Sequence, residues 1–280
     1  MTASFDGKAR IWNAATGEPV KSLEHNKARV YHAAFSPPDG RYLVTAGSAE
    51  TRIWDVDTGA FKSLPGTAGG EYAAFSADGR YVVTTGDRGQ VWNVATGERV
   101  TTLEHNAAVS YAAFSPDGRA VVTAGLDHTA RIWNAATGEP VGVPLRPTGQ
   151  VEHLSFSPGG RLLATASAYD GRLQLWDAAT GEPVTPALQH PDTVWHASFS
   201  PGGRRVLTAC GDGAARLWDV PFEERPLAEL RPLAEVLAGV RMRAPGTFVP
   251  LEPAQFHRDW MRLWSKDPNG ETEHCLGCSD

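Results

Sequence analysis

The stretch Asp127-His-Thr-Ala-Arg-Ile-Trp-Asn134 decides the fold, because close variants of its last five residues recur through most of the chain. Ala-Arg-Ile-Trp-Asn also stands at 9–13, Thr-Arg-Ile-Trp-Asp at 51–55 and Ala-Arg-Leu-Trp-Asp at 215–219. A repeat period of about 40 residues with Trp at a fixed place indicates an array of similar four-stranded sheets. The tryptophans that close the phrase are Trp12, Trp54, Trp92, Trp133, Trp176 and Trp218.

Each repeat reads as a series of short strands joined by tight turns. Around Trp133, the segments 109–114, 120–124 and 129–133 have the alternating or β-branched residues of strands. Between the first two, Ser-Pro-Asp-Gly forms a turn, because Pro presets φ, Asp caps the turn and Gly supplies a positive φ. Sheets this small cannot bury both faces alone, so the sequence predicts an all-β propeller whose blades stack around an axis. The turn returns at 36–41, 76–80, 157–161 and 200–204, and a Thr-Gly turn returns at Thr16, Thr58, Thr96, Thr137 and Thr180.

The repeats resemble the WD-repeat β-propeller family over residues 2–220. The resemblance implies that a buried hydrogen-bonded set holds each blade. The set comprises a His before the inner strand, a Ser or Thr on the second strand, an Asp in the next turn, and the Trp. Two blades carry all four residues, which are His105, Thr123, Asp127 and Trp133 in one and His190, Thr208, Asp212 and Trp218 in the other.

Three other blades depart from this pattern. The 25–54 unit lacks the Asp, and the 65–92 and 145–176 units lack the His, so we expect these blades to be less rigidly held. Thr, His and Asp are also residue types of a catalytic triad. Their recurrence in separate blades favours a structural network, because an active site would be unique and exposed.

The repeats add up to about five blades and a partial blade at the N-terminus, within a domain that we place at 1–221. Residues 1–12 align with 122–133, so the chain opens at the end of a second strand, and we expect it to belong to a longer gene product. A sealed ring is not expected from this piece. Unpaired strand edges at its ends favour self-association.

The sequence changes character over 222–266, where we expect a short α-helical segment of two helices. Leu and Val residues have helical spacing in 227–240, and a second apolar stripe lies within 253–265. The second helix either docks on the propeller or binds a partner. This segment is similar to the C-terminal end of large bacterial WD-repeat proteins, which often carry an upstream Ser/Thr protein kinase domain. No kinase motif occurs within the 280 residues. The stripe consists of Phe256, Trp260, Leu263 and Trp264.

Residues 267–280 form a polar tail that we expect to be disordered. The single Cys275-x-x-Cys278 pair in it is more typical of such an end than of a metal or redox site.

Composition narrows the function classes. The chain has 41% hydrophobic residues and a net charge of −6, which is ordinary for a globular protein and lacks the basic footprint of a nucleic-acid binder. No run is long enough to span a membrane, no signal peptide is visible, and three cysteines are too few for a disulfide framework. We expect a cytoplasmic protein that is not an enzyme and uses no cofactor or metal.

The loops that lead into the inner strands form the rim that propellers usually use for binding, and two positions recur there in each blade. Trp and Tyr dominate interface hot spots, so aromatic and imidazole groups at a channel mouth suit a partner-binding surface. We expect the outer position to be exposed and the inner position to pack between blades or to bind a partner. Metal binding by the inner histidines is not expected, because Tyr interrupts them. The outer residues are Tyr31, Glu71, Ser110, Glu152 and Trp195, and the inner residues are His32, Tyr72, Tyr111, His153 and His196.

These observations favour a non-catalytic scaffold that presents one propeller face to protein or peptide partners. The alternative is a sensor or regulatory module of a bacterial multidomain Ser/Thr protein kinase. Such a module would bind a peptide or small molecule at the channel mouth.

Overall fold

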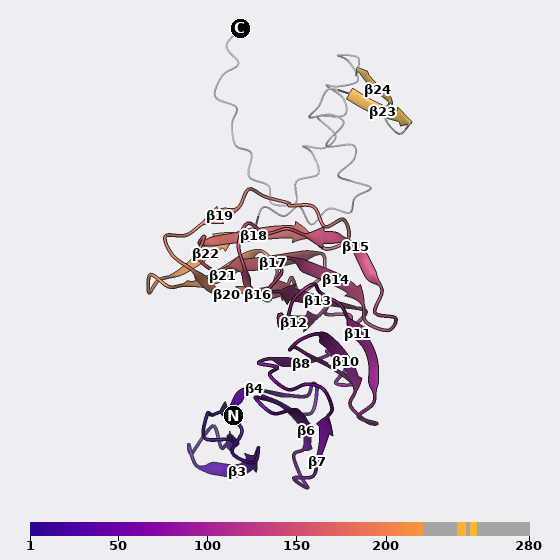
Figure 1. The fold of residues 1–280 in the computed structure, drawn as a ribbon. Helices are drawn as coiled ribbons and strands as arrows, with labels where there is room; N and C mark the ends of the chain where they lie inside the picture. The colour runs from indigo at the N-terminus through magenta and orange to yellow at the C-terminus, as the bar shows by residue number, and fades with distance from the viewer. Residues whose placement is uncertain (221–239, 245–246, 251–280) are drawn as a thin grey trace. The chain divides into compact units, whose positions relative to one another are not determined.

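The computed structural model describes residues 1–220, 240–244 and 247–250. The chain divides into two compact units, Met1–Pro221 and Phe222–Asp280. In the first unit, six antiparallel sheets follow one another in chain order, and within each sheet consecutive strands are neighbours (Figure 1). The predicted all-β architecture of successive blades is confirmed, and the described residues contain no helix.

Four of these sheets have four strands, and the first and last have three. The first sheet contains β1 (Thr2–Ala3), β2 (Lys8–Trp12) and β3 (Pro19–Glu24). The second contains β4 (Val30–Phe35), β5 (Tyr42–Gly47), β6 (Thr51–Asp55) and β7 (Phe61–Leu64). The third contains β8 (Ala73–Phe75), β9 (Tyr81–Thr84), β10 (Gly89–Asn93) and β11 (Arg99–Leu103). The fourth contains β12 (Val109–Phe114), β13 (Ala120–Gly125), β14 (Ala130–Asn134) and β15 (Pro140–Leu145). The fifth contains β16 (Val151–Phe156), β17 (Leu162–Ser167), β18 (Arg172–Asp177) and β19 (Leu188–Gln189). The last contains β20 (Val194–Phe199), β21 (Arg205–Cys210) and β22 (Ala215–Asp219).

The turn between β12 and β13 shows how the repeated Ser-Pro-Asp-Gly sequence joins two strands. Ser115 Oγ donates to Asp117 Oδ1 at 2.6 Å, and the backbone N–H of Ala120 donates to Ser115 Oγ at 2.9 Å. Gly118 has a φ of 71°, which glycine adopts without the steric cost of a side chain. The turn therefore reverses the chain within a few residues.

Each interior sheet is buried on both faces because it packs between its two neighbours. Between the fourth and fifth sheets, Val122 and Ile132 of one lie in the same apolar cluster as Leu163 and Trp176 of the other. The four interior tryptophans are at most 7% exposed, so the core is a series of sheet-to-sheet interfaces. The equivalent clusters between earlier sheets contain Trp54, Trp92 and Trp133.

The outward faces of the first and last sheets are less covered. Trp12 is 38% exposed, and Leu207 and Leu217, which pair across β21 and β22, are 47% and 57% exposed. Their counterparts in the fourth sheet, Val122 and Ile132, are 0% and 5% exposed. Strand pairs with substantial contacts join successive sheets, and none of them joins the last sheet to the first. The described residues of this unit therefore form an arc of sheets.

The second unit contributes one described element, a hairpin of β23 (Val240–Ala244) and β24 (Thr247–Pro250). The hairpin lies where we expected the connection between two helices. Apart from Val240, which begins β23, the helices expected at 227–240 and 253–265 lie outside the described residues, as does the tail with Cys275 and Cys278. In the described part of the chain, nothing forms a helix that could cross a bilayer.

Candidate partner-binding rim

One side-chain hydrogen bond is common to all six sheets of the first unit. The indole Nε1–H of the repeated Trp donates to the Oγ1 of a Thr on the neighbouring strand, at 2.7 to 3.1 Å. From the second sheet onward this Thr is fully buried, so the bond satisfies a polar group that has no access to water. The pairs are Trp12–Thr2, Trp54–Thr45, Trp92–Thr84, Trp133–Thr123, Trp176–Thr165 and Trp218–Thr208.

The structure brings together all four residues of the set predicted in the fourth sheet. His105 Nε2 lies 2.6 Å from Thr123 Oγ1, and His105 Nδ1 lies 3.2 Å from Asp127 Oδ1. Since Nδ1–H donates to the carboxylate, Nε2 accepts from the Thr hydroxyl, whose oxygen still accepts from Trp133. Burial lowers the pKa of His105, which keeps the imidazole neutral at pH 7.

The second predicted set is not closed, which corrects the sequence-based prediction. His190 Nε2 lies 2.9 Å from Thr208 Oγ1, but His190 Nδ1 donates to the backbone carbonyl of Leu188 at 3.1 Å. Asp212 instead pairs with Arg216 through both of its carboxylate oxygens, at 3.2 and 2.5 Å. A guanidinium offers a carboxylate two charge-assisted hydrogen bonds, whereas a neutral imidazole offers one weaker bond.

The second sheet holds a partial set. His25 Nε2 lies 2.5 Å from Thr45 Oγ1, while Nδ1 is buried and has no hydrogen-bond partner among the described residues. Six residues before the Trp, where most other blades have Asp, this blade has Ser48, and Glu50 pairs with Arg52. Burial lowers the pKa of His25 to about 4, so this ring is also neutral at pH 7.

The fifth sheet lacks the His, and there the hydroxyl of Thr148 donates to Asp170. Buried polar contacts of one kind thus recur from sheet to sheet with different completeness. Such a pattern fits a network that fixes strands in place.

The five inner rim residues form one continuous stack across five sheets. Centroids of neighbouring rings lie 3.9 to 4.5 Å apart. The Tyr111 hydroxyl donates to the Tyr72 hydroxyl at 3.0 Å and lies 2.9 Å from His153 Nε2. The rings therefore pack between adjacent sheets, in the order His32, Tyr72, Tyr111, His153 and His196.

Burial keeps the middle of this stack uncharged. Burial, followed by the neighbouring His196, lowers the pKa of His153 to about 3, and burial raises the pKa of the Tyr111 phenol. His196 ends the stack and is exposed. Among the described residues, no group of His, Cys, Asp or Glu has the arrangement of a metal site.

The five outer residues follow the rim, one from each of the same sheets. Glu71 and Trp195 are exposed, and Tyr31, Ser110 and Glu152 are half-buried. Ser110 Oγ lies 3.3 Å from the carbonyl oxygen of Ala124 and 3.4 Å from that of Val151, so its single hydroxyl hydrogen is shared between the fourth and fifth sheets. Burial, and then the charge of Glu71, raises the pKa of Glu152. The inner residues beside them, Tyr72 and His153, both stack on Tyr111 with ring centroids 4.2 and 4.5 Å apart, so the third and fifth sheets approach closely at this rim.

Sequence reasoning missed three large exposed residues on the rim. Phe5, Leu126 and Tyr169 are 66%, 44% and 87% exposed. Each directly precedes the Asp in the turn between the second and third strands of its blade, so aligned repeats could have revealed them. Phe5 lies in a cluster with the Tyr31 ring at 5.6 Å and the Arg29 guanidinium at 5.4 Å.

Tyr169 and Trp195 together form what we call the aromatic patch. Tyr169 has a φ of 65°, a conformation that is costly for a bulky residue. Its backbone N–H donates to Thr193 Oγ1 at 3.3 Å, and Thr193 stands two residues before Trp195. Since Trp195 is itself 58% exposed, the rim carries two uncovered aromatic side chains, one in the turn between β17 and β18 and one at the start of β20.

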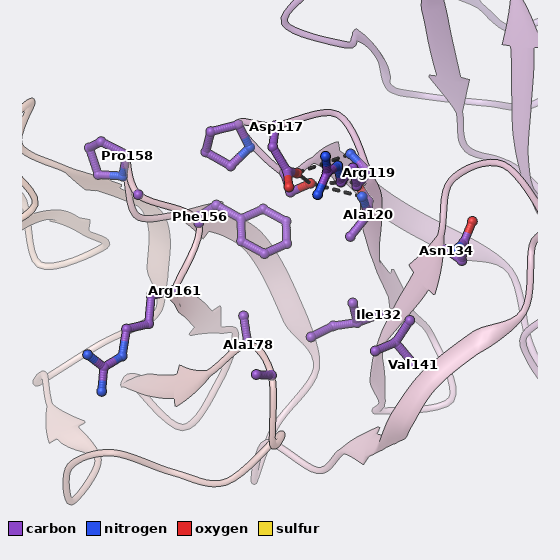
Figure 2. Close-up of a pocket in the computed structure, with 15 residues that line it drawn as sticks. Asp117, Arg119, Ala120, Ile132, Asn134, Val141, Phe156, Pro158, Arg161 and Ala178 are labelled. Atoms are coloured by element: carbon purple, nitrogen blue, oxygen red, sulfur yellow. Dashed lines mark hydrogen bonds between the residues drawn. The ribbon is translucent and has the colours of Figure 1, made fainter. Parts of the chain in front are cut away.

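Two cavities lie near these elements. One, of about 440 Å³, is lined by Tyr111, His153 and His196 of the ring stack. The other, of about 640 Å³, lies between the fourth and fifth sheets at the strand ends opposite the rim. Figure 2 shows Phe156 and Asp117 among the side chains that line this second cavity. Asp117 is held within its own turn, so the second cavity offers mainly apolar walls.

Comparison with known proteins identifies the family. The pattern described as "WD domain, G-beta repeat" matches residues 17–55, 97–134, 138–177 and 181–219. Two fungal proteins called "Nuclear distribution protein PAC1", from Arthroderma benhamiae and Trichophyton verrucosum, are each 39% identical to this chain over 56 residues. That segment is 20% of this chain and 12% of each fungal protein, so the similarity reaches only a small part of those relatives. Because the four matched segments make up more than half of the chain, and each ends in a blade that carries the Trp–Thr hydrogen bond, this protein belongs to the WD-repeat family.

Proposed function

We propose that this chain is a non-catalytic scaffold that binds protein or peptide partners through its rim. WD repeats generally mediate protein–protein interaction, and WD-repeat proteins are typically non-catalytic. The observation that carries the proposal is the aromatic patch, in which Tyr169 and Trp195 are 87% and 58% exposed. Trp and Tyr are enriched among the few residues that supply most of the binding energy at protein interfaces.

The burial of the Thr, His and Asp set supports a role without chemistry. Thr123 is 0% exposed and the His105 side chain is also fully buried, so a substrate would have no route to either group. The Thr–Trp bond that accompanies this set occurs in every sheet of the first unit. A network repeated in this way stabilises the blades that carry the rim.

A second candidate function is a sensor or regulatory module, including one that serves a bacterial multidomain Ser/Thr protein kinase. The observation that favours it is the cavity of about 440 Å³ beside the ring stack. A pocket of this size suits a small molecule or the side chains of a peptide. A scaffold would bind its partner on the rim loops, whereas a sensor would bind its ligand against Tyr111 and His153.

Selection from a peptide-display library on the 280-residue chain tests the scaffold proposal. The selected peptides are then measured against Trp195→Ala, and against Val143→Ala, a control on β15 where the side chain is 67% exposed. We expect Trp195→Ala to weaken binding about tenfold or more, which corresponds to about 1.4 kcal/mol, and Val143→Ala to leave it unchanged. Peptides that bind both variants equally well would contradict a binding rim.

A further inference from the structure

The aromatic patch is connected to a carboxylate on the neighbouring inner strand. The Gln150 side chain donates to Glu152 Oε1 at 3.2 Å, and the Gln150 carbonyl accepts from the backbone N–H of Ala168 at 2.7 Å. Ala168 directly precedes Tyr169. Glu152 and the two exposed rings therefore belong to one continuous part of the rim.

A second carboxylate stands on the other side of the intervening sheet. Glu71 and Glu152 occupy the same rim position in the third and fifth sheets, and only the small Ser110 occupies it in the fourth. Within the described part of the chain, no ion pair includes either glutamate. Arg88, another charged group of these loops, is already paired with Glu104 at 2.7 Å.

We propose that the partner of this rim is a basic segment of another protein. One Lys or Arg side chain of that segment sits between Glu71 and Glu152, and its neighbouring residues lie on Trp195 and Tyr169. This inference rests on the proposed function, because it names the partner class for the same surface. A partner cation offsets the repulsion between the two carboxylates, which an acidic or neutral segment would leave in place.

The neighbouring rings suit the same partner. The face of an indole or phenol ring attracts a guanidinium or ammonium group, and the apolar stem of a Lys or Arg side chain packs on aromatic surface. Trp195 lies in the sheet next to the one that carries Glu152, at the same rim position. One short basic segment can therefore contact both the carboxylate and the indole ring. An apolar patch without carboxylates would give no such preference.

The test uses the tightest peptide from the display selection that depends on Trp195, together with an analogue in which its Arg is replaced by citrulline. Citrulline keeps the shape of Arg and removes the charge. With the full chain we expect the citrulline analogue to bind about tenfold more weakly, and this loss to shrink to less than about threefold in Glu152→Gln and in Glu71→Gln. Glu139→Gln removes an exposed carboxylate at the opposite strand ends and should keep the tenfold loss.

Each possible result of these binding measurements either supports or contradicts a basic partner segment. Equal binding of the Arg and citrulline peptides, with Trp195 still required, would overturn the basic segment and leave the rim function standing. The same result follows if the selected peptides that need Trp195 contain no Lys or Arg. A tenfold loss that persists in both Gln variants would overturn the assigned position of the cation. If no selected peptide depends on Trp195, the proposed function fails, and this inference fails with it.

Discussion

Replacing the buried threonines by valine would measure what the hydrogen-bonded set contributes to stability. Thr123 Oγ1 serves both His105 Nε2 at 2.6 Å and Trp133 Nε1 at 2.7 Å, and the whole cluster is buried. Valine has the same shape but leaves two buried polar groups unsatisfied, each at a cost of about 1–3 kcal/mol. Among the described side chains, Thr165 Oγ1 bonds to the Trp176 indole alone, at 3.0 Å. We therefore expect Thr123→Val to cost about 2–6 kcal/mol and Thr165→Val about 1–3 kcal/mol.

Equilibrium unfolding in urea, followed by tryptophan fluorescence, would measure both free energies. Thr102→Val measures the effect of replacing Thr by Val where no hydrogen bond is lost, because the Thr102 hydroxyl makes no hydrogen bond among the described residues. If Thr165→Val costs as much as Thr123→Val, then the histidine adds nothing to the Thr–Trp bond, and our reasoning about the complete set is wrong.

Three further predictions address acid stability, the repeated tryptophan and the end faces. The pKa of buried His25 is lowered from 6.5 to about 4, so its contribution is fully present above pH 6.5 and declines as the pH falls towards 4. Between pH 7.5 and pH 5 this group should cost about 2 kcal/mol of unfolding free energy, so the loss should be smaller by about that amount in His25→Gln, and equal losses would contradict this assignment. Trp133→Ala should lower the free energy of unfolding by about 3–5 kcal/mol. Trp12→Ala should lower it by clearly less, because Trp12 is 38% exposed. Similar values for the two variants would show that burial does not determine how much stability the substitution removes. Because Leu207 and Leu217 leave an apolar face uncovered, the chain should self-associate at micromolar concentration, and Leu217→Lys should shift sedimentation towards the monomer.

The fold could be predicted from the sequence because its signals are local and repeated. The Trp that closes each third strand and the Ser-Pro-Asp-Gly turn are each explained by bonds within one blade, as Ser115 and Asp117 show. Six copies of one unit also make the period visible without any long-range information. The division of the chain into blades and the order of strands within each blade can therefore be predicted from these features.

The details of the site depend on distances that the sequence does not contain. Spacing placed Asp212 with His190, but Arg216 lies close enough to take the carboxylate with two hydrogen bonds. Aligned repeats could have singled out Tyr169 as a turn residue, but its exposure and the hydrogen bond that links its turn to the Trp195 segment are known only from the structure. Likewise, the inner residues recur visibly, but their stacking depends on how closely neighbouring sheets approach.

The arrangement of sheets in chain order determines how the unit should come apart. Among the described strands of the first unit, each sheet has substantial contacts only with the sheets before and after it, so stability resembles that of a linear stack with nearest-neighbour coupling. A terminal sheet has one such neighbour and an interior sheet has two. Fraying should therefore begin at both ends and move inwards. The third and fourth sheets, which Tyr72 and Tyr111 link through a hydrogen bond of 3.0 Å, would be the last to separate.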